Sequence, residues 1–497
     1  MGGTGQTTRA ASEQAVARPA VPPGPYLVLG LGRAGRAAAT ALAARFGPGR
    51  VCAWDGAVTP ATLQARRELR ALGVDVQLGS AHPPPGMRPG TIVRSPGIPL
   101  DHPIIAASLA PGAALIDELE LGWRLAEARV VGVTGTNGKG TVSTLVTQAL
   151  TAAGEHAATT GNWEFGRPLS GVRASPCSWL VCEVSSYQLE ASTAFLPDVA
   201  VLTNLAHDHL DRHGSMDEYG AHKRRMFVRA TRTVPAAIVG VDDAFGRALA
   251  AQLEAAGASL RTVGSGLAAS HRVRGCAWTL REGRVELDTP SGPVQLRCRL
   301  PGVHNAHNIA TALAVADALG VAREVALAAI AVARPAPGRL ELVDAGQPFD
   351  ALVDYAHNPS AYRAALETVR AVVDTRPGAR LIAVISVATN KDRSKRPAMA
   401  GVTRRLADLT LVTRGNRDGS EPLERAMEDL MRAAKPAGGA RMELVPDRRA
   451  AIARAVAQAR PGDAVLVLGR GSSSRPLDPG GPPFDDRAAL RDAIGGA

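Results

Sequence analysis

The sequence is poor in cysteine, and the few cysteines it has form no recognisable framework. Five cysteines in 497 residues make an odd count without a CxxC pair, namely Cys52, Cys177, Cys182, Cys276 and Cys298. This pattern argues against a set of disulfides or a zinc site and favours a reducing compartment, so we expect a cytoplasmic protein. No apolar run reaches the roughly 18 residues of a membrane helix, so no membrane span is expected. Residues 1–24 lack the apolar core of a secretory signal and predict a disordered tail.

Aromatic residues and lysines are also scarce. Aromatics make up 3% of the chain, and its net charge of +11 comes from arginines scattered over every segment. Nucleic-acid-binding proteins gather their cations in a stripe and stack bases on aromatic rings, so no nucleic-acid partner is expected. Five of the 57 cationic residues are lysines, namely Lys139, Lys223, Lys391, Lys395 and Lys435. Where arginine supplies nearly every cation, a retained lysine marks chemistry that a guanidinium cannot perform.

Length and strand pattern predict several α/β domains. At roughly 150 residues per domain, the chain accommodates about three. Apolar, β-branched runs such as 130–133 and 381–387 alternate with Ala-rich helical stretches, which is typical of parallel sheets covered by helices on both faces. Residues 272–300 alternate around turn residues instead and predict antiparallel hairpins. A Pro-Ala-Pro-Gly break at 335–338 predicts a linker, so we expect domains over 25–128, 129–334 and 335–497.

A first glycine-rich loop follows the first predicted strand. It places Gly30, Gly32 and Gly35 before a helix, and Asp55 follows the next strand, 20 residues after Gly35. Such glycines let the backbone approach a phosphate at a helix N-terminus, and an acid at this distance binds a hydroxyl-bearing group. A tight turn between strand and helix would need glycine as well. The loop predicts a nucleotide-binding N-terminal domain.

A second glycine-rich loop, residues 132–141, follows the strand at Val130. Its sequence is Gly-Val-Thr-Gly-Thr-Asn-Gly-Lys-Gly-Thr, and a helix is expected to begin near Thr141. Backbone N–H groups of such a loop, together with Lys139, can hold the phosphates of ATP. The strict P-loop pattern fails at Val133, and again at Gly140, where a hydroxyl residue would follow the lysine. Thr141 supplies a candidate hydroxyl one position later.

This loop and several further blocks resemble the Mur ligase superfamily of ATP-dependent amide ligases. The blocks are 95–98 (Ser-Pro-Gly-Ile), 161–162 (Gly-Asn), 183–190 (Glu-Val-Ser-Ser-Tyr-Gln-Leu-Glu), 204–214, Lys223 and 300–308. The glycine loop at 30–35 and the blocks at 95–98 and 183–190 are most similar to the family member that adds D-glutamate. With Gly140, the loop reads Gly-Thr-Asn-Gly-Lys-Gly-Thr, which is closer to the corresponding loop of folylpolyglutamate synthetases. Residues 354–359 (Asp-Tyr-Ala-His-Asn-Pro) and 447–450 look more like the member that adds the third residue of the peptide.

The resemblance implies a role for each matching residue. It implies ATP binding for Gly135, Thr136, Asn137, Gly138, Lys139, Gly140, Thr141, Asn305, Asn308, Arg339 and Asp354. It implies binding of a UDP-linked substrate for Gly30, Gly32, Gly35, Asp55, Ser95, Pro96, Gly97 and Asn162. Mg²⁺ would be held by Thr141, Glu183, His209 and an N-carbamylated Lys223. The catalytic residues would be Lys139, Lys223 and His209, and the incoming amino acid would contact Lys391, Ser472 and Ser473.

The expected protein is therefore an α/β ligase of three domains. They are a Rossmann-like N-terminal domain, a central P-loop-type ATPase domain with a mainly parallel sheet, and a Rossmann-like C-terminal domain. The resemblance implies that a monomer uses ATP and Mg²⁺ to join D-glutamate to UDP-N-acetylmuramoyl-L-alanine through an acyl phosphate, in peptidoglycan precursor synthesis. A Mur ligase for another amino acid and a folylpolyglutamate synthetase are alternatives. A nicotinamide-dependent oxidoreductase would use 30–35 but leaves Lys139, Glu183 and Lys223 unexplained.

Overall fold

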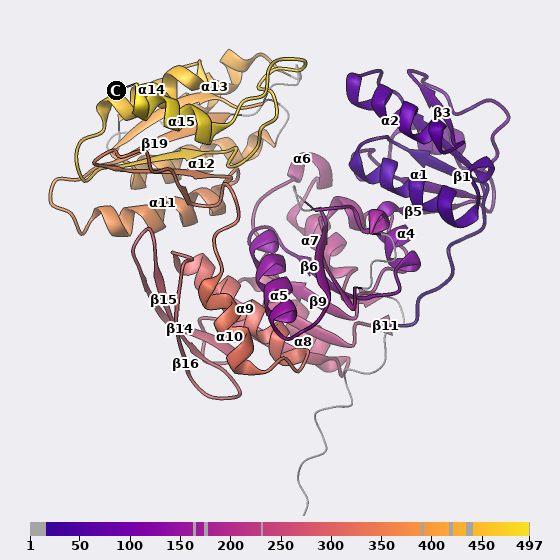
Figure 1. Cartoon of the computed structure of the whole chain (residues 1–497), viewed down its shortest axis with the longest axis horizontal. Helices are drawn as coiled ribbons and strands as arrows, with labels where there is room; N and C mark the ends of the chain where they lie inside the picture. Colours follow the sequence, from indigo (N-terminus) through magenta and orange to yellow (C-terminus); the bar gives the residue numbers. More distant parts are fainter. Residues whose placement is uncertain are drawn as a thin grey trace, which may run out of the picture.

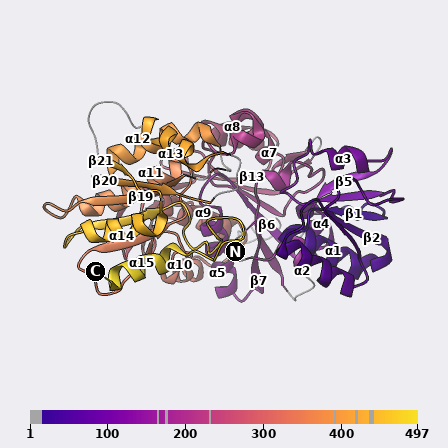
Figure 2. The same cartoon turned by 90° about the horizontal axis from the view of Figure 1, so that it is seen from above.

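The computed structural model describes residues 16–162, 166–172, 177–229, 232–387, 389, 392–416, 421–433 and 441–496. The chain builds three main β-sheets in sequence order. Figure 1 shows the elements of the first and third sheets on opposite sides of the second, and Figure 2 shows the same order from above. Within the described residues, no helix has both the length and the apolar character needed to cross a membrane.

The first sheet has five parallel strands in the order β3-β2-β1-β4-β5. All four side chains of β1 are buried, which is why the strand is continuously apolar instead of alternating. The strands are β1 (Tyr26–Leu29), β2 (Val51–Asp55), β3 (Asp75–Leu78), β4 (Thr91–Arg94) and β5 (Ala114–Asp117). The helices are α1 (Arg33–Phe46), α2 (Pro60–Ala71), α3 (Pro103–Ser108) and α4 (Glu118–Leu125).

Residues 16–24 pack along the central part of the molecule before the chain enters β1. Val16 is 8% exposed and lies in an apolar core, and its N–H donates to Asp198 Oδ1 at 2.8 Å. Arg18 Nη2 donates to the carbonyl oxygen of Ala128 at 2.7 Å. The prediction of a disordered tail over 1–24 is therefore wrong for residues 16–24, because these contacts are made with residues more than 100 positions away. Residues 1–15 lie outside the described ranges.

The second sheet has nine strands in the order β16-β15-β14-β13-β12-β9-β6-β8-β7. They are β6 (Arg129–Thr134), β7 (Ala157–Gly161), β8 (Trp179–Glu183), β9 (Val199–Leu202), β12 (Ala236–Gly240), β13 (Ser259–Gly264), β14 (His271–Trp278), β15 (Gly283–Asp288) and β16 (Val294–Cys298). Strands β14, β15 and β16 pair antiparallel, which confirms the hairpins predicted for 272–300. A separate pair joins β10 (Val228–Arg229) to β11 (Arg232–Thr233).

Helices cover both faces of this sheet. One face packs against α5 (Lys139–Ala152), α9 (Val303–Ala318) and α10 (Arg323–Val332), and the other packs against α8 (Ala244–Ala255). Each buried Val or Leu of these cores contributes about 1.5–3 kcal/mol of transfer free energy. The short helices α6 (Leu210–His213) and α7 (Met216–Arg224) lie after β9 in the chain. This packing fixes the loop between β6 and α5 at the carboxyl edge of the parallel strands, where ligands of such sheets bind.

The third sheet has six strands in the order β17-β18-β22-β19-β20-β21, with only β17 antiparallel. The strands are β17 (Glu341–Leu342), β18 (Asp350–Asp354), β19 (Leu381–Val387), β20 (Leu409–Arg414), β21 (Arg441–Leu444) and β22 (Ala464–Leu468). The helices are α11 (Pro359–Val373), α12 (Arg396–Leu406), α13 (Leu423–Ala433), α14 (Arg448–Gln458) and α15 (Asp486–Gly495). Single 3₁₀ turns are η1 (Pro48–Arg50), η2 (Leu169–Gly171), η3 (Tyr187–Leu189) and η4 (Arg393–Lys395).

The segment between α10 and β17 links the second and third sheets. Leu340 has a φ of +44°, and its N–H donates to Asp354 Oδ2 at 2.7 Å, so the carboxylate holds this strained residue in place. The predicted Pro-Ala-Pro-Gly linker lies in this segment. Each sheet falls within one of the ranges 25–128, 129–334 and 335–497, which we keep as the proposed domains.

Candidate active site

The second glycine loop joins β6 to α5 and opens onto a large cleft. The helix begins at Lys139, two residues before the predicted start. Gly138 has a φ of +85°, and a Cβ placed there would lie 2.3 Å from Asn308 Oδ1. Glycine is therefore required at this position both for its backbone conformation and for the approach of α9.

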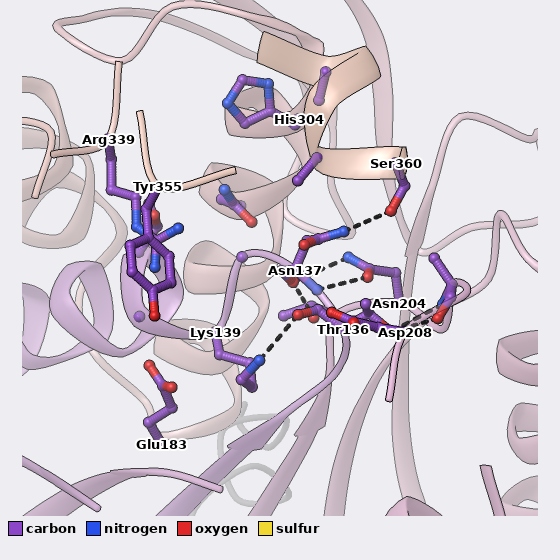
Figure 3. Close-up of a pocket in the computed structure, with 18 of the residues that line it drawn as sticks. Thr136, Asn137, Lys139, Glu183, Asn204, Asp208, His304, Arg339, Tyr355 and Ser360 are labelled. Carbon is purple, nitrogen blue, oxygen red and sulfur yellow. Dashed lines mark hydrogen bonds between the residues drawn. The ribbon is translucent and has the colours of Figure 1, made fainter. Parts of the chain in front are cut away.

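Two lysines converge on this loop. The carbonyl oxygen of Gly135 accepts hydrogen bonds from Lys223 Nζ at 2.8 Å and from Lys139 Nζ at 3.2 Å. Lys139 also donates to the carbonyl oxygen of Thr136 at 2.9 Å, and Figure 3 shows its side chain pointing that way. Burial lowers the pKa of both ammonium groups, and their mutual repulsion lowers that of Lys223 further. Desolvation thus favours the neutral amine, most strongly at Lys223, and an anion bound in the cleft would favour the charged form of Lys139.

Glu183 ends the strand beside β6 and faces Lys139 across the cleft (Figure 3). Asn162 Nδ2 donates to Glu183 Oε1 at 3.4 Å. Carboxylate and hydroxyl oxygens are the ligands that Mg²⁺ prefers, so Glu183 and Thr141, which also lines the cleft, fit the ion. Among the described residues, no three His, Cys, Asp or Glu side chains gather as a metal cluster. A Mg²⁺ held by one carboxylate, waters and phosphates needs no such cluster.

His209, the third predicted catalytic residue, also lines the cleft. Its Nδ1 lies 2.9 Å from the hydroxyl of Tyr187, and burial lowers its pKa to about 3, so the imidazole is neutral. A neutral imidazole has one nitrogen lone pair for a ligand or a proton. The structure thus brings His209 to the same cleft as Lys139 and Lys223, and its role as a metal ligand stays a prediction.

Asp208 is the residue at which the central and C-terminal parts meet. It is 2% exposed. Its Oδ2 accepts from Asn358 Nδ2 at 2.9 Å, and its Oδ1 accepts from Lys395 Nζ at 3.1 Å. His357 Nε2 lies 3.6 Å from Oδ2. Burial alone would raise the pKa of this carboxyl, but the groups around it, with His357 and His209 first, hold the pKa well below its usual range.

Asn137 ties the glycine loop to the same interface. Its backbone N–H donates to Asn204 Oδ1 at 3.0 Å, and its side-chain amide donates to Ser360 Oγ at 2.8 Å (Figure 3). Asn358 Nδ2, the group that also contacts Asp208, donates to Asn137 Oδ1 at 3.1 Å. The loop that would hold phosphates is therefore bonded directly to the C-terminal part of the chain.

The cleft has a volume of about 1240 Å³ and collects most of the predicted site. Arg339 enters it from the linker, with its guanidinium 4.5 Å from the ring centroid of Tyr355 (Figure 3). The predicted residues that line it are Pro96, Gly97, Thr136, Asn137, Gly138, Lys139, Gly140, Thr141, Asn162, Glu183, His209, Lys223, Asn305, Asn308, Arg339, Asp354 and Ser472. Gly135 lies just behind this surface. The cleft is large enough for a nucleotide together with a second substrate.

The first glycine loop lies outside this cleft. Asp55 Oδ2 accepts the N–H of Leu31 at 2.7 Å, and a Cβ on Gly35 would lie 1.7 Å from the carbonyl oxygen of Gly30. These contacts are those of a tight turn between strand and helix. The roles of Gly30, Gly32, Gly35, Asp55 and Ser95 in binding a UDP-linked substrate stay predictions.

A second, smaller cavity of about 150 Å³ lies in the C-terminal part, and Tyr355 and His357 line both cavities. Ser473 lines the smaller one. Arg470, 3% exposed, lines it too, and neither its Nε nor its Nη1 bonds to any residue within the described ranges. Asn416 Oδ1 in the same wall is likewise buried without a described partner. The predicted contact Lys391 lies outside the described residues.

Sequence reasoning missed the residues at this interface. Asp208 was part of a matching block without a role of its own, and Asn358 and His357 served only to mark a resemblance. Lys395 had no role, although the scarcity of lysine could have revealed it. Lys139, Lys223 and Lys395, the three lysines within the described residues, all lie at the walls of the two cavities.

A glycine loop with two buried lysines, an acid on the neighbouring strand and a C-terminal α/β part bonded to the loop define a nucleotide-binding α/β enzyme with more than one substrate. The chain matches the Mur ligase middle domain over residues 133–316 and the "Mur ligase, glutamate ligase domain" over residues 338–471. It is 34% identical over 387 residues, 73% of this chain and 76% of the relative, to the UDP-N-acetylmuramoyl-L-alanyl-D-glutamate--2,6-diaminopimelate ligase of Chromobacterium violaceum. The chain belongs to the Mur ligase family.

Solved structures agree on the fold. UDP-N-acetylmuramate-alanine ligase MurC from Thermotoga maritima superposes with a TM-score of 0.59 at 18% identity, over 95% of this chain and 99% of that chain. Folylpolyglutamate synthase from Mycobacterium tuberculosis superposes with a TM-score of 0.55 at 20% identity, over 69% of this chain and 88% of that chain. The α/β class with mainly parallel sheets is thus confirmed.

The prediction of the D-glutamate-adding member is wrong, because relatives at 34% and 31% identity are named 2,6-diaminopimelate ligases and another at 34% is named UDP-N-acetylmuramyl-tripeptide synthetase. The alternative of another Mur ligase with a different amino acid fits better. The error arose from the blocks at 30–35 and 95–98, which lie before either matched domain, and from the block at 183–190, which lies within the middle domain. Family membership over 133–316 and 338–471 disfavours the nicotinamide-dependent oxidoreductase.

Proposed function

We propose that this ATP-dependent, ADP-forming ligase adds 2,6-diaminopimelate to UDP-N-acetylmuramoyl-L-alanyl-D-glutamate in peptidoglycan precursor synthesis. The observation that carries the proposal is the pair of adjoining cavities. The large cleft holds the phosphate loop, and the small one is lined by Arg470, whose Nε and Nη1 bond to no described residue although its Nη2 donates to the carbonyl oxygen of Phe484. The names of the relatives support the choice of substrates.

The small cavity supports an acceptor that carries a carboxylate. Arg470 Nε and Nη1 lie on different edges of the guanidinium, and each can donate one charge-assisted hydrogen bond to a carboxylate oxygen, while Nη2 donates to backbone carbonyl oxygens. Asn416 Oδ1, in the same wall, would accept a hydrogen bond from an ammonium group. Diaminopimelate has a carboxylate and an ammonium at each end, so one end can occupy this cavity while the other reaches the cleft. Leaving buried donors unpaired costs about 1–3 kcal/mol each, which an acceptor of this chemistry would recover.

The large cleft supports activation of the substrate carboxylate. A carboxylate is a poor electrophile, and phosphoryl transfer to it depends mainly on positioning and charge neutralisation. Lys139 and the N–H groups of the loop would hold the ATP phosphates, and Lys223 would lie beside the transferred group. Mg²⁺, held by Glu183 and Thr141, would supply further charge neutralisation when bound. The neutral acceptor amine would then attack the acyl carbon from the side of Tyr355 and His357, which line both cavities. The C–N bond forms as the C–O bond to phosphate breaks, inorganic phosphate leaves, and the nitrogen releases a proton to solvent.

A carbamate on Lys223 is part of the proposal. The reaction of an amine with CO₂ needs the neutral form, and burial favours this form by lowering the pKa of Lys223. The side chain is 1% exposed and lies 4.5 Å from the ring centroid of Tyr219, so it is no surface cation. The charged sequence of α7 is typical of an exposed helix, but the side chain of Lys223 is buried.

Phosphate release with defined substrate pairs tests the proposal. We expect release with UDP-N-acetylmuramoyl-L-alanyl-D-glutamate and diaminopimelate, and turnover at least tenfold lower when lysine replaces diaminopimelate. Equal or better turnover of UDP-N-acetylmuramoyl-L-alanine with D-glutamate would contradict it.

A pair of variants tests the small cavity. Arg470→Met should raise the KM for diaminopimelate by about 10–100-fold, the equivalent of a charge-assisted hydrogen bond. The KM for the UDP-linked substrate should stay within twofold. Arg229→Met is the matched control, because Arg229 is a half-buried guanidinium whose Nε is also buried without a described partner, but it lies in the central part, against Ser192 and Phe195. If the KM for diaminopimelate changed equally in both variants, Arg470 would not be a contact of the acceptor.

A further inference from the structure

The guanidinium of Arg94 lies fully buried between the N-terminal and central sheets. Its Nε donates to Asp117 Oδ1 at 2.8 Å, and its Nη1 donates to Glu190 Oε2 at 2.8 Å and to the carbonyl oxygen of Ile98 at 2.5 Å. Its Nη2 donates to the carbonyl oxygen of Tyr187 at 2.6 Å. Arg94 and Ile98 belong to the N-terminal part, whereas Tyr187 and Glu190 belong to the central part. One side chain therefore joins the two.

A second guanidinium meets the same acceptors from the central part. Arg212, in α6, donates from Nε to Glu190 Oε1 at 2.9 Å and from Nη2 to Glu190 Oε2 at 2.6 Å. Its Nη2 also lies 3.3 Å from the carbonyl oxygen of Ile98. The same guanidinium stacks 5.0 Å from the ring centroid of Tyr187, whose hydroxyl contacts His209 in the cleft. A continuous chain of contacts thus runs from Arg94 to the active site.

The cluster lies next to the loop after β4. Among the described residues of the N-terminal part, only this loop reaches the cleft. Pro96 and Gly97 line the cleft, and they lie between Arg94 and the carbonyl oxygen of Ile98 that both guanidiniums hold. Asp117 and Glu190 balance the two cations, so removal of Arg94 would leave a buried carboxylate unpaired. A guanidinium binds several acceptors in a fixed plane, which a lysine at this position could not do.

We propose that Arg94 is a positioning residue: it locks the N-terminal and central parts into one body and fixes Pro96 and Gly97 where they contact the UDP-linked substrate. This inference rests on the proposed function for the identity of that substrate. The C-terminal part joins this body through a separate set of contacts, at Asp208 and Asn137, which Arg94 does not touch. Arg94 touches neither the phosphate loop nor the small cavity.

Arg94→Met in the full-length protein tests the proposal by kinetics. The KM for the UDP-linked substrate should rise at least tenfold, with the KM for ATP within twofold. Arg94→Lys keeps the positive charge but loses the planar set of N–H donors. Its KM for the UDP-linked substrate should therefore fall between those of the wild type and Arg94→Met. Arg448→Met is the matched control, because Arg448 is also fully buried and pairs with Asp486 inside the C-terminal part. It should lower the melting temperature without changing the KM for the UDP-linked substrate.

Hydrogen–deuterium exchange tests the same inference without any substrate. Arg94→Met should speed exchange at 95–98 and 187–190 and leave the phosphate loop unchanged. If the wild type does not turn over UDP-linked peptides, the proposed function fails, and exchange still decides the positioning role. Should Arg94→Met not fold, Glu190→Gln takes its place, since it removes the charge and keeps the shape. A KM within twofold of the wild type together with unchanged exchange, or full recovery by Arg94→Lys, would overturn the proposal.

Discussion

Asp208→Asn would test whether the C-terminal part must be held against the phosphate loop for the reaction. The wild-type carboxylate accepts hydrogen bonds from Asn358 Nδ2, from Lys395 Nζ and from the N–H of His209. An asparagine keeps one oxygen and presents an amide donor in place of the other. That donor would face either the ammonium of Lys395 or the amide of Asn358, so at least one contact across the interface becomes repulsive.

The magnitude follows from burial and charge. Lys395 is 5% exposed, and its ion pair with Asp208 spans 3.1 Å. A hydrogen bond between charged groups contributes about 1.5–3 kcal/mol, and this loss applies only to the closed arrangement, because an opened interface lets water solvate the lysine. At about 1.4 kcal/mol per factor of ten, the closed arrangement should become roughly 10–100-fold less populated. We therefore expect kcat/KM to fall by that factor, with ATP affinity nearly unchanged.

Phosphate-release kinetics and small-angle scattering would measure the effect. Asp208→Asn should show a smaller ligand-induced compaction than the wild type at the same nucleotide concentration. Asp208→Asn combined with Lys395→Met should recover part of the loss, because no unpaired charge remains. Glu68→Gln is the control, since the Arg36–Glu68 pair is exposed and such pairs contribute at most about 1 kcal/mol. A kcat/KM for Asp208→Asn within threefold of the wild type would refute the reasoning.

Three further outcomes are expected. Lys223→Arg should lower turnover by about 10²-fold, and acetate should partly rescue the activity of Lys223→Ala. After addition of labelled bicarbonate, ¹³C NMR should reveal a carbamate only in the wild type. Full activity of Lys223→Arg would rule out the carbamate. Gly138→Ala should weaken ATP binding at least tenfold by calorimetry, because its Cβ would clash with Asn308 Oδ1 and its φ is positive; unchanged affinity would mean that the loop does not hold phosphates. Burial lowers the pKa of His304 and His357 from 6.5 to about 4. Between pH 6.5 and about 4 these histidines are therefore protonated in the unfolded chain but neutral in the folded protein, so the free energy of unfolding should fall as the pH drops through this range. Denaturant melts with the same midpoint at both ends of the range would contradict this.

The sequence predicted those features of the fold that depend on the spacing of nearby residues. Glycine spacing marked the phosphate loop, and alternation marked the β14–β16 hairpins. The burial of Lys223 had no local signal, because α7 carries charged residues along most of its length and looks like a surface helix. The contacts of Asp208 join residues 150 and 187 positions apart, and no spacing rule connects positions so distant. The added amino acid was misassigned because the blocks behind the assignment, at 30–35, 95–98 and 183–190, lie in the N-terminal and central parts and none of them lines the acceptor cavity.

The placement of the lysines makes ordinary amine chemistry a probe of the active site. Of five lysines in the chain, three lie within the described residues, and each borders one of the two cavities. In most proteins an acylating reagent modifies dozens of surface amines, and its effect on activity says little about the site. Here arginines cover the surface and do not react, so a reagent small enough to enter the cleft would report on Lys139, Lys223 and Lys395. Their relative labelling, read by mass spectrometry, would map which parts of the cleft each bound substrate shields.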